Sequence, residues 1–223
     1  MIRLAESILA TPRRFSALHR LILASLAVTL AMASPSGVWA AEPSEAGRFL
    51  ESLSARAIDE LVNSEVEQEE KESRFRELLR TGFDIPTIGR FVLGRYWRQA
   101  TEEEQKAFLG AFETFIVQRF TPLFSAYRGD TLEVGEAHPH PETPNIVTVA
   151  SKLVRAQGEP VSVDWRIRRI DNQYKIFDVV AEGVSMGIAL RSEYTSILQQ
   201  HGGHISALTE QMRRKNAEQA MAR

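Results

Sequence analysis

The chain has 223 residues, of which 27 are Lys or Arg and 29 are Asp or Glu, and it contains no cysteine. The absence of cysteine excludes disulfide bonds and thiol catalysis, so an apolar core must stabilise the fold. The near balance of charges argues against the strongly basic surface that nucleic-acid-binding proteins use.

Residues 1–40 are typical of a signal peptide. Four arginines precede an apolar run, residues 21–32, that is too short to span a bilayer, and Val38-Trp39-Ala40 fits a cleavage site. We therefore predict export to the bacterial periplasm and a single domain over residues 41–223, with a disordered tail from about residue 214. This domain has 23 basic and 28 acidic residues, a net charge of −5, which disfavours nucleic acid and anionic membrane as principal partners.

Helical periodicity dominates the first half of the domain. Apolar residues recur every three to four positions over residues 44–61, which predicts an amphipathic helix. A capping-box pattern at Ser64 predicts the start of a second helix, which should end at Gly82. A short third helix over residues 86–93 should end at Gly94.

The longest predicted helix begins at a capping box opened by Thr101 and runs to about residue 127, with Pro122 expected to kink or end it. Ten aromatic residues fall within residues 83–127. For any one of them, a filled core is the simpler explanation. As a group facing a sheet, such rings can also line an apolar cavity.

The periodicity changes to two after residue 130 and predicts an antiparallel sheet. The four predicted strands are residues 131–134, 145–154, 160–170 and 173–182. Turn-forming residues separate them, so a meander is the natural pairing. In the third strand Val163, Trp165 and Ile167 share the apolar face.

Two helices are predicted after the sheet. Ser185 can cap a helix that runs to about Gln200, residues 201–203 break it, and a last helix begins near Ser206. The expected fold class is therefore α+β: an antiparallel four-stranded sheet with one face covered by N- and C-terminal helices.

Few residues are suited to catalysis. His138 and His140 lie in a turn-rich loop without a third ligand, so no metal site is predicted. Asp178, between two apolar residues, is the best candidate for a general base. The alternative is a structural carboxylate that pairs with an arginine or a backbone amide.

Two separated motifs give a more specific indication: LGRYW at residues 93–97 and YKIFDVVAEGVS at residues 174–185. They match the L-G-x-x-W and Y-x-I-x-D-V-x-x-E-G-V-S elements of the MlaC, or toluene-tolerance, family of periplasmic phospholipid-binding proteins, and Arg191 and Tyr194 continue the match. The resemblance covers residues from about 45 to 210.

This resemblance implies an α+β fold that encloses an apolar lipid cavity and a role without enzymatic activity or cofactor. The implied ligand is a phospholipid. The implied partners are an outer-membrane lipoprotein complex and an inner-membrane ABC transporter with an MCE-domain subunit. We expect a monomer, because a shuttle must present its cavity to two partners in turn.

The candidates for the cavity wall are apolar residues near the motifs, on the long helix and on the sheet: Phe91, Leu93, Tyr96, Trp97, Phe112, Phe115, Val163, Trp165, Ile167, Val184 and Met186. Arg95 and Arg98 are candidates for contact with the lipid phosphate, although ion pairs with nearby acidic residues explain them equally well.

Three alternatives remain open from the sequence. The chain could be a hopanoid-associated lipid-binding paralogue, since sequence does not separate these two ligands. It could be an enzyme that acts on an apolar substrate with Asp178 as base. It could also be an interaction module whose aromatic residues simply fill the core.

Overall fold

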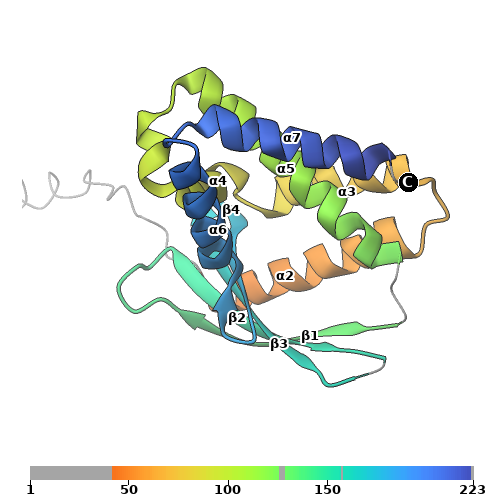
Figure 1. The fold of residues 1–223 in the computed structure, drawn as a ribbon. Coiled ribbons are helices and arrows are strands. Elements are labelled where there is room, and N and C mark those ends of the chain that lie inside the picture. Colours follow the sequence, from red (N-terminus) through yellow and green to blue (C-terminus); the bar gives the residue numbers. More distant parts are fainter. Residues whose placement is uncertain (1–41, 126–128, 157, 222–223) are drawn as a thin grey trace, which may run out of the picture. The chain divides into compact units, whose positions relative to one another are not determined.

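A five-stranded antiparallel sheet and the helices around it form the described part of the chain (Figure 1). This computed structural model describes residues 42–125, 129–156 and 158–221, and all of them belong to one unit, Trp39–Arg223. The expected signal peptide lies outside the described residues. Within those residues, no helix is both long enough and apolar enough to span a lipid bilayer.

The elements follow the predicted order of helices, strands and helices. The helical segments are α2 (Pro43–Ala57), η1 (Ile58–Val62), α3 (Gln68–Gly82), α4 (Ile85–Leu93), η2 (Gly94–Gln99), α5 (Glu102–Ser125), α6 (Met186–Gln200) and α7 (Ile205–Met221). The strands are β1 (Thr131–Pro139), β2 (Ile146–Val154), β3 (Val161–Ile170), β4 (Gln173–Ala181) and β5 (Val184–Ser185). The predicted α+β class is confirmed. The sheet has one more strand than predicted, because β5 has only two residues and is too short to show a periodic pattern in the sequence.

The strands follow one another across the sheet in chain order, and each pairs antiparallel with the next, which confirms the predicted meander. The register places Trp165 between Val149 of β2 and Val179 of β4, so these three side chains share one face. Beyond β4, the edge of the sheet pairs with β5 at one end and with Phe83, through Ile176, at the other. These contacts protect that edge from pairing with another chain.

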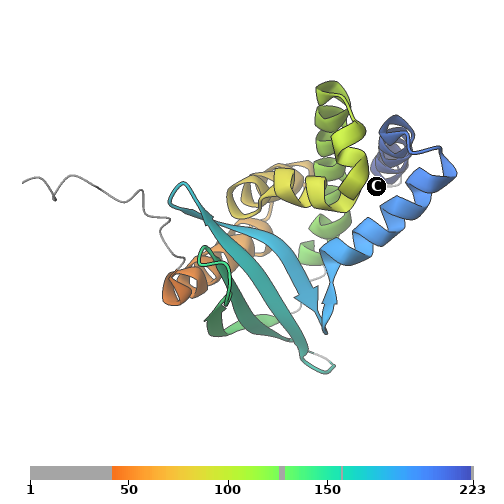
Figure 2. The ribbon, with the colours of Figure 1, turned by 90° about the vertical axis from the view of Figure 1, so that its left-hand side faces the viewer.

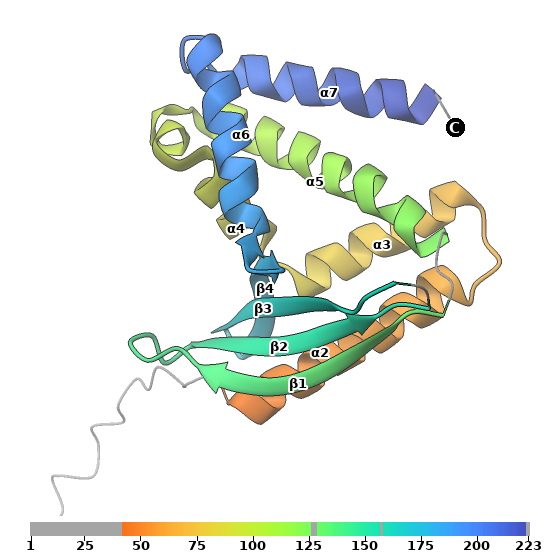
Figure 3. The ribbon, with the colours of Figure 1, turned by 60° about the horizontal axis from the view of Figure 1, so that its bottom comes forward.

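Helix α2 lies against this face of the sheet (Figure 3). We call the resulting apolar cluster the sheet core; its buried members are Ala46, Leu50, Val147, Val149, Ile167 and Ile176. The hydroxyl of Tyr174 on β4 accepts a hydrogen bond from the Glu42 amide at 3.1 Å and donates one to the Glu45 carboxylate at 2.9 Å. These bonds fix the N-terminal end of α2 to the sheet.

A second apolar cluster, the helical core, lies where α5 packs against α7 and where α4 packs against α6. The rings of Phe108 and Phe112 stack at 5.6 Å, and Tyr194 of α6 meets both edge-on at 6.3 Å. Its other buried members are Leu79, Ile85, Val92, Leu93, Tyr96, Ala111, Val117, Leu198, Ile205, Leu208 and Met212.

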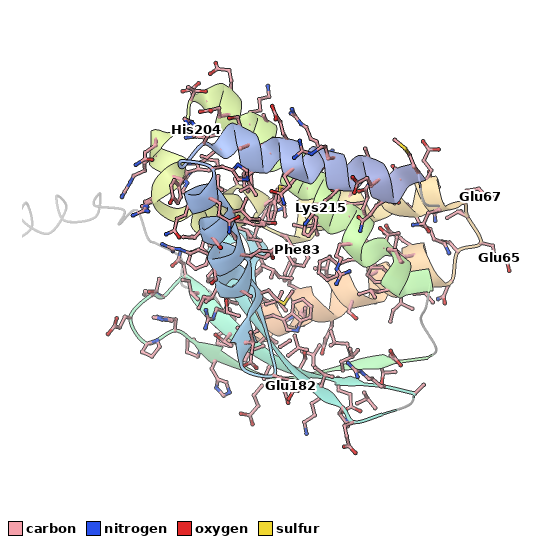
Figure 4. The ribbon with its side chains drawn as sticks, in the orientation of Figure 1. Glu65, Glu67, Phe83, Glu182, His204 and Lys215 are labelled. Atoms are coloured by element: carbon pink, nitrogen blue, oxygen red, sulfur yellow. The ribbon has the colours of Figure 1, made fainter. Side chains whose placement is uncertain are left out.

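Phe83 packs against both cores. It follows the last residue of α3, and Figure 4 shows its side chain between α6 and α2. The buried members of the two cores are otherwise different residues on different elements. The chain therefore has two separate apolar clusters that meet at Phe83.

The structure confirms one predicted capping box and contradicts the other. The Thr101 hydroxyl accepts a hydrogen bond from the Glu104 amide at 3.2 Å, and the Glu104 carboxylate accepts one from the Thr101 amide at 3.0 Å. The capping box predicted at Ser64 is wrong. The Ser64 hydroxyl instead donates to the carbonyl of Glu60 in η1, which is a π-helical turn. Helix α3 begins four residues after Ser64.

The last helix is longer than predicted. Disorder was expected from about residue 214, but α7 continues to Met221. Asn216 is buried, and its side-chain amide donates to the carbonyl of Ala111 in α5 at 3.1 Å. This contact across the helix pair explains why the polar composition of the segment was a poor guide to its structure.

An ion-pair cluster joins α3 to α5. Glu113 accepts hydrogen bonds from Arg76 at 2.7 Å and from Arg80 at 2.9 Å. Burial raises the pKa of the Glu113 carboxyl, but the hydrogen bonds and positive charges of Arg80 and Arg76 outweigh this effect, so the pKa lies below its usual value. A carboxyl whose pKa is lower in the folded state stabilises the fold at pH values above its unfolded-state pKa. This contribution is lost as the pH falls through the folded-state pKa.

We expect Glu113→Gln to lower the free energy of unfolding at neutral pH, because the variant loses the negative charge that pairs with the two arginines. The loss should be only about 1 kcal/mol, because Arg80 is largely exposed and solvent screens its charge. The variant should also lose less stability than wild type as the pH falls below about 4.5. Urea unfolding over a series of acidic buffers measures both effects. Parallel pH profiles for the two proteins would contradict the assignment.

Candidate functional site

The two sequence motifs meet where α4 packs against α6. Phe91 lies near the end of α4, and a Cβ on Gly187 of α6 would lie 3.2 Å from its ring. The guanidinium carbon of Arg191 lies 5.1 Å from the centre of the same ring. Gly94 has φ +54°, and a Cβ there would lie 3.0 Å from Nη2 of Arg191. The glycine at position 94 therefore allows α4 to end there, and it lets the Arg191 side chain approach the backbone closely.

Asp178 of β4 fixes the start of α6. Its Oδ2 accepts hydrogen bonds from Ser185 Oγ at 2.7 Å and from Arg166 Nη1 at 3.0 Å. Its Oδ1 accepts hydrogen bonds from the backbone amides of Gly187 at 3.1 Å and Val179 at 3.0 Å. The Ser185 hydroxyl in turn caps α6 by accepting from the amide of its third residue.

This geometry gives Asp178 a structural role. A carboxylate offers about four lone-pair positions, and four donors occupy them here. The side chain is 9% exposed, so none of its lone pairs is directed at a substrate. In the described part of the chain, no three His, Cys, Asp or Glu side chains gather closely enough to hold a metal ion.

The predicted cavity-wall residues divide into three groups. Leu93, Tyr96 and Phe112 are buried in the helical core, and Trp97 and Phe115 are partly buried against it. Val163, Trp165 and Ile167 lie on the face of the sheet that forms the sheet core. Phe91, Val184 and Met186 are exposed at the surface, with exposed fractions of 41%, 60% and 38%.

Apolar side chains at the edges of the two cores are only partly buried. Phe115 and Leu190 border the helical core, Trp165 and Val179 border the sheet core, and Phe83 touches both. We call these five residues the core border. The wall candidates from the sequence did not include Leu190 or Val179, and Phe83 was counted only among the ten aromatic residues that could line a cavity. Two signals could have indicated the first two: Leu190 lies one helical turn before Tyr194, and Val179 lies opposite Trp165.

The two predicted headgroup arginines lie on η2 and are exposed. Arg95 donates to the Tyr96 hydroxyl at 2.9 Å, and its guanidinium carbon lies 4.9 Å from the centre of that ring. Among the described residues, neither Arg95 nor Arg98 forms an ion pair. The alternative explanation, pairing with the acidic residues at the start of α5, therefore does not describe this structure.

Arg168 is a further arginine whose position the sequence did not reveal. Its guanidinium donates to the Asp84 carboxylate and to the Thr87 hydroxyl, the latter at 2.6 Å. Asp84 also caps α4 by accepting from the Thr87 amide at 3.1 Å. The sheet thus positions the start of α4, which carries the first motif at its other end.

Two open grooves lie on the described part of the surface, and their linings include both polar and apolar groups. One, of about 420 Å³, lies between α2 and β1 and includes Arg48, Glu51 and His138. The other, of about 440 Å³, lies along α6 and is lined by Ile188, Arg191, Ser192, Thr195, Ser196 and Gln199. Both grooves are open to solvent and would leave much of an apolar ligand uncovered, so the core border is the better candidate for binding such a ligand.

The arrangement of these helices on an antiparallel sheet also occurs in a solved structure. The structure of the phospholipid-binding protein from Ralstonia solanacearum, in complex with a phospholipid, is similar to this chain with a TM-score of 0.71. The similarity covers 78% of this chain and 98% of that one at 18% sequence identity. At this identity, the comparison establishes a shared fold.

The sequence comparisons identify the family. The sequence model of the MlaC protein family matches residues 51–214, and the chain belongs to that family. A relative from Haemophilus influenzae, the intermembrane phospholipid transport system binding protein MlaC, is 23% identical over 122 residues. That match spans 53% of this chain and 56% of the relative, or about half the length of each. The resemblance carried by the two motifs is confirmed.

Proposed function

We propose that this protein is a periplasmic phospholipid carrier that moves lipids between the outer membrane and an inner-membrane ABC transporter, and so maintains the lipid asymmetry of the outer membrane. The observation that carries the proposal is membership of the MlaC family over residues 51–214. The name of the Haemophilus influenzae relative and the phospholipid bound to the Ralstonia solanacearum protein support it. The signal peptide expected at residues 1–40 is consistent with the periplasm.

We place the acyl chains at the core border, between the helical core and the sheet core. Phe115 and Leu190 would contact the chains from the helices, and Trp165 and Val179 would contact them from the sheet. All four are apolar and partly buried, so they have surface left to cover. Phe83 would lie at the closed end of the site, because it already packs against both cores.

The energetics of lipid transfer require such a lining. Each buried methylene contributes about 0.8 kcal/mol, so exposing two chains of about 15 carbons to water would cost roughly 24 kcal/mol. A carrier must therefore cover nearly the whole length of both chains. Because the lipid is then about equally stable in the carrier and in a bilayer, direction must come from ATP hydrolysis at the transporter or from differences in affinity among the partners.

The headgroup can remain in water at the mouth of the site, so little specific polar recognition is needed. Arg95 and Arg98 remain our candidates for contact with the phosphate. Both are exposed without an ion-pair partner among the described residues, and Arg95 is held against the Tyr96 ring. The helical core contains Tyr96 and Leu93, so a phosphate bound by Arg95 would lie at the edge of that core.

Mass spectrometry of an organic extract tests the proposal directly. Protein purified from the periplasm without detergent should release phospholipid in a stoichiometric amount. A triterpenoid in the same extract would instead identify a hopanoid-binding paralogue. An extract that repeatedly contains no lipid, together with a melting temperature unchanged by added phospholipid, would favour an interaction module with a filled core.

A further inference from the structure

The exposed apolar side chains of this protein are concentrated at one place. Six large apolar residues are exposed in the described part of the chain, and four of them, Phe91, Val184, Met186 and Ile188, lie where α4 meets β5 and α6. We call these four residues the apolar patch. Figure 2 shows β5 and the first turn of α6 at the edge of the sheet, away from α2. Clustered exposed apolar surface of this kind marks an interaction site.

The backbone beneath the apolar patch is rigidly held. Asp178 and Ser185 together bind the first amides of α6, and β5 pairs with the end of β4. The aromatic ring of Phe91 packs over Gly187. Side chains on such a fixed backbone lose little conformational freedom on binding, which favours affinity.

Arg191 supplies a positive charge at the margin of the apolar patch. Its guanidinium lies over the Phe91 ring and against the backbone of Gly94, so its position is set before any partner binds. In the described residues it forms no salt bridge, which leaves its charge available to a partner. Arginines held in this way beside aromatic rings are frequent anchors of protein interfaces.

The neighbouring groove on α6 has the composition of an interface rim. It is lined by Ile188 and Arg191 together with four polar residues: Ser192, Thr195, Ser196 and Gln199. An apolar centre with a polar rim and an arginine is the usual anatomy of a protein–protein contact.

We propose that the apolar patch and the α6 groove form a docking face for a protein that presents a carboxylate beside an apolar recess. Residues 41–223 have a net charge of −5, which opposes binding to an anionic bilayer and favours a protein over a membrane as the occupant. Four residues form only the centre of such an interface, because a stable complex buries about 1,200–2,000 Å². The choice of partner rests on the proposed function, under which a carrier must dock on the proteins that load and unload it.

Ile188→Glu and Arg191→Glu test the docking face, and Leu123→Glu is the matched control. Leu123 is 61% exposed and Ile188 is 58% exposed, but Leu123 lies near the C-terminal end of α5. Figure 3 shows that end of α5 away from the start of α6. The probes are the purified periplasmic MCE domain of the transporter, the purified outer-membrane lipoprotein, and phospholipid vesicles with anionic lipid. Affinity for each probe, melting temperature and phospholipid content are measured for every protein.

We expect both variants to bind at least one of the two protein probes tenfold or more weakly than wild type, while Leu123→Glu binds normally. Added salt should weaken wild-type binding more than that of Arg191→Gln, because the variant lacks the charge. Wild-type protein that binds neither protein probe, or variants that bind as well as wild type, would overturn the proposal. Vesicle binding that the two variants abolish would assign the face to a membrane instead.

Phospholipid content separates this proposal from the proposed function. Variants that lose binding but keep a normal lipid load support a docking face separate from the lipid site. If even wild type carries no lipid, the carrier function fails, whereas the binding measurements still decide whether the face docks a protein.

Discussion

Asp178→Ala should lower the free energy of unfolding by about 2–4 kcal/mol, because it removes a nearly buried carboxylate that accepts four hydrogen bonds. The amide of Gly187 and the hydroxyl of Ser185 would lose their acceptor. The start of α6 should therefore loosen from β4, which urea unfolding and amide hydrogen exchange at α6 can measure.

Two comparisons make this prediction specific. Asp178→Asn keeps the shape and part of the acceptor capacity, so it should lose less stability than the alanine variant. Asp164→Ala on the neighbouring strand should change stability by less than about 0.5 kcal/mol, because Asp164 is exposed. If Asp178→Asn kept full stability while abolishing turnover of an apolar substrate, a catalytic role would have to replace the structural one.

Val179→Lys should reduce the phospholipid that co-purifies with the protein by at least about tenfold. Val179 lies opposite Trp165 at the core border, where we place the acyl chains. An ammonium group there would lie among apolar groups without a partner, which costs several kcal/mol. A loss of about 1.4 kcal/mol in binding free energy is enough to weaken affinity tenfold. Mass spectrometry of the extract measures the loss, and circular dichroism checks the fold.

Leu123→Lys provides the control, since it places the same lysine at an apolar residue that is 61% exposed near the end of α5. Its phospholipid content should equal that of wild type. Equal lipid content in a folded Val179→Lys protein would mean that the chains lie elsewhere. Loss of lipid in both variants would mean that the loss does not report on the core border.

The parts of the fold that local physics determines were predictable from the sequence. Thr101 with Glu104, Gly94 and Ser185 mark helix ends through bonds within a few residues of themselves, and all three ends are confirmed. Alternation placed Trp165 correctly on the apolar face of the sheet. The error at Ser64 arose because a π-turn competes for the same hydroxyl, a choice that local pattern cannot decide.

The parts that depend on distant contacts were not predictable. Asn216 is held by a carbonyl of α5, and Arg168 reaches the cap of α4, and neither partner is near in sequence. The packing around the candidate site likewise depends on contacts between residues that are distant in sequence. Aromatic richness indicated a core or a cavity, but only the packing shows that the apolar residues form two clusters with partly buried edges.

Phe83 as the meeting point of two cores has a consequence for how the proposed carrier can work repeatedly. Each core has its own set of buried residues. A molecule inserted between the two cores would therefore change the distance between them and leave the packing inside each core intact. Delivery of a cargo would then leave no large void to collapse or to flood with water. The protein could return empty and still folded, and take up another molecule without help from a chaperone.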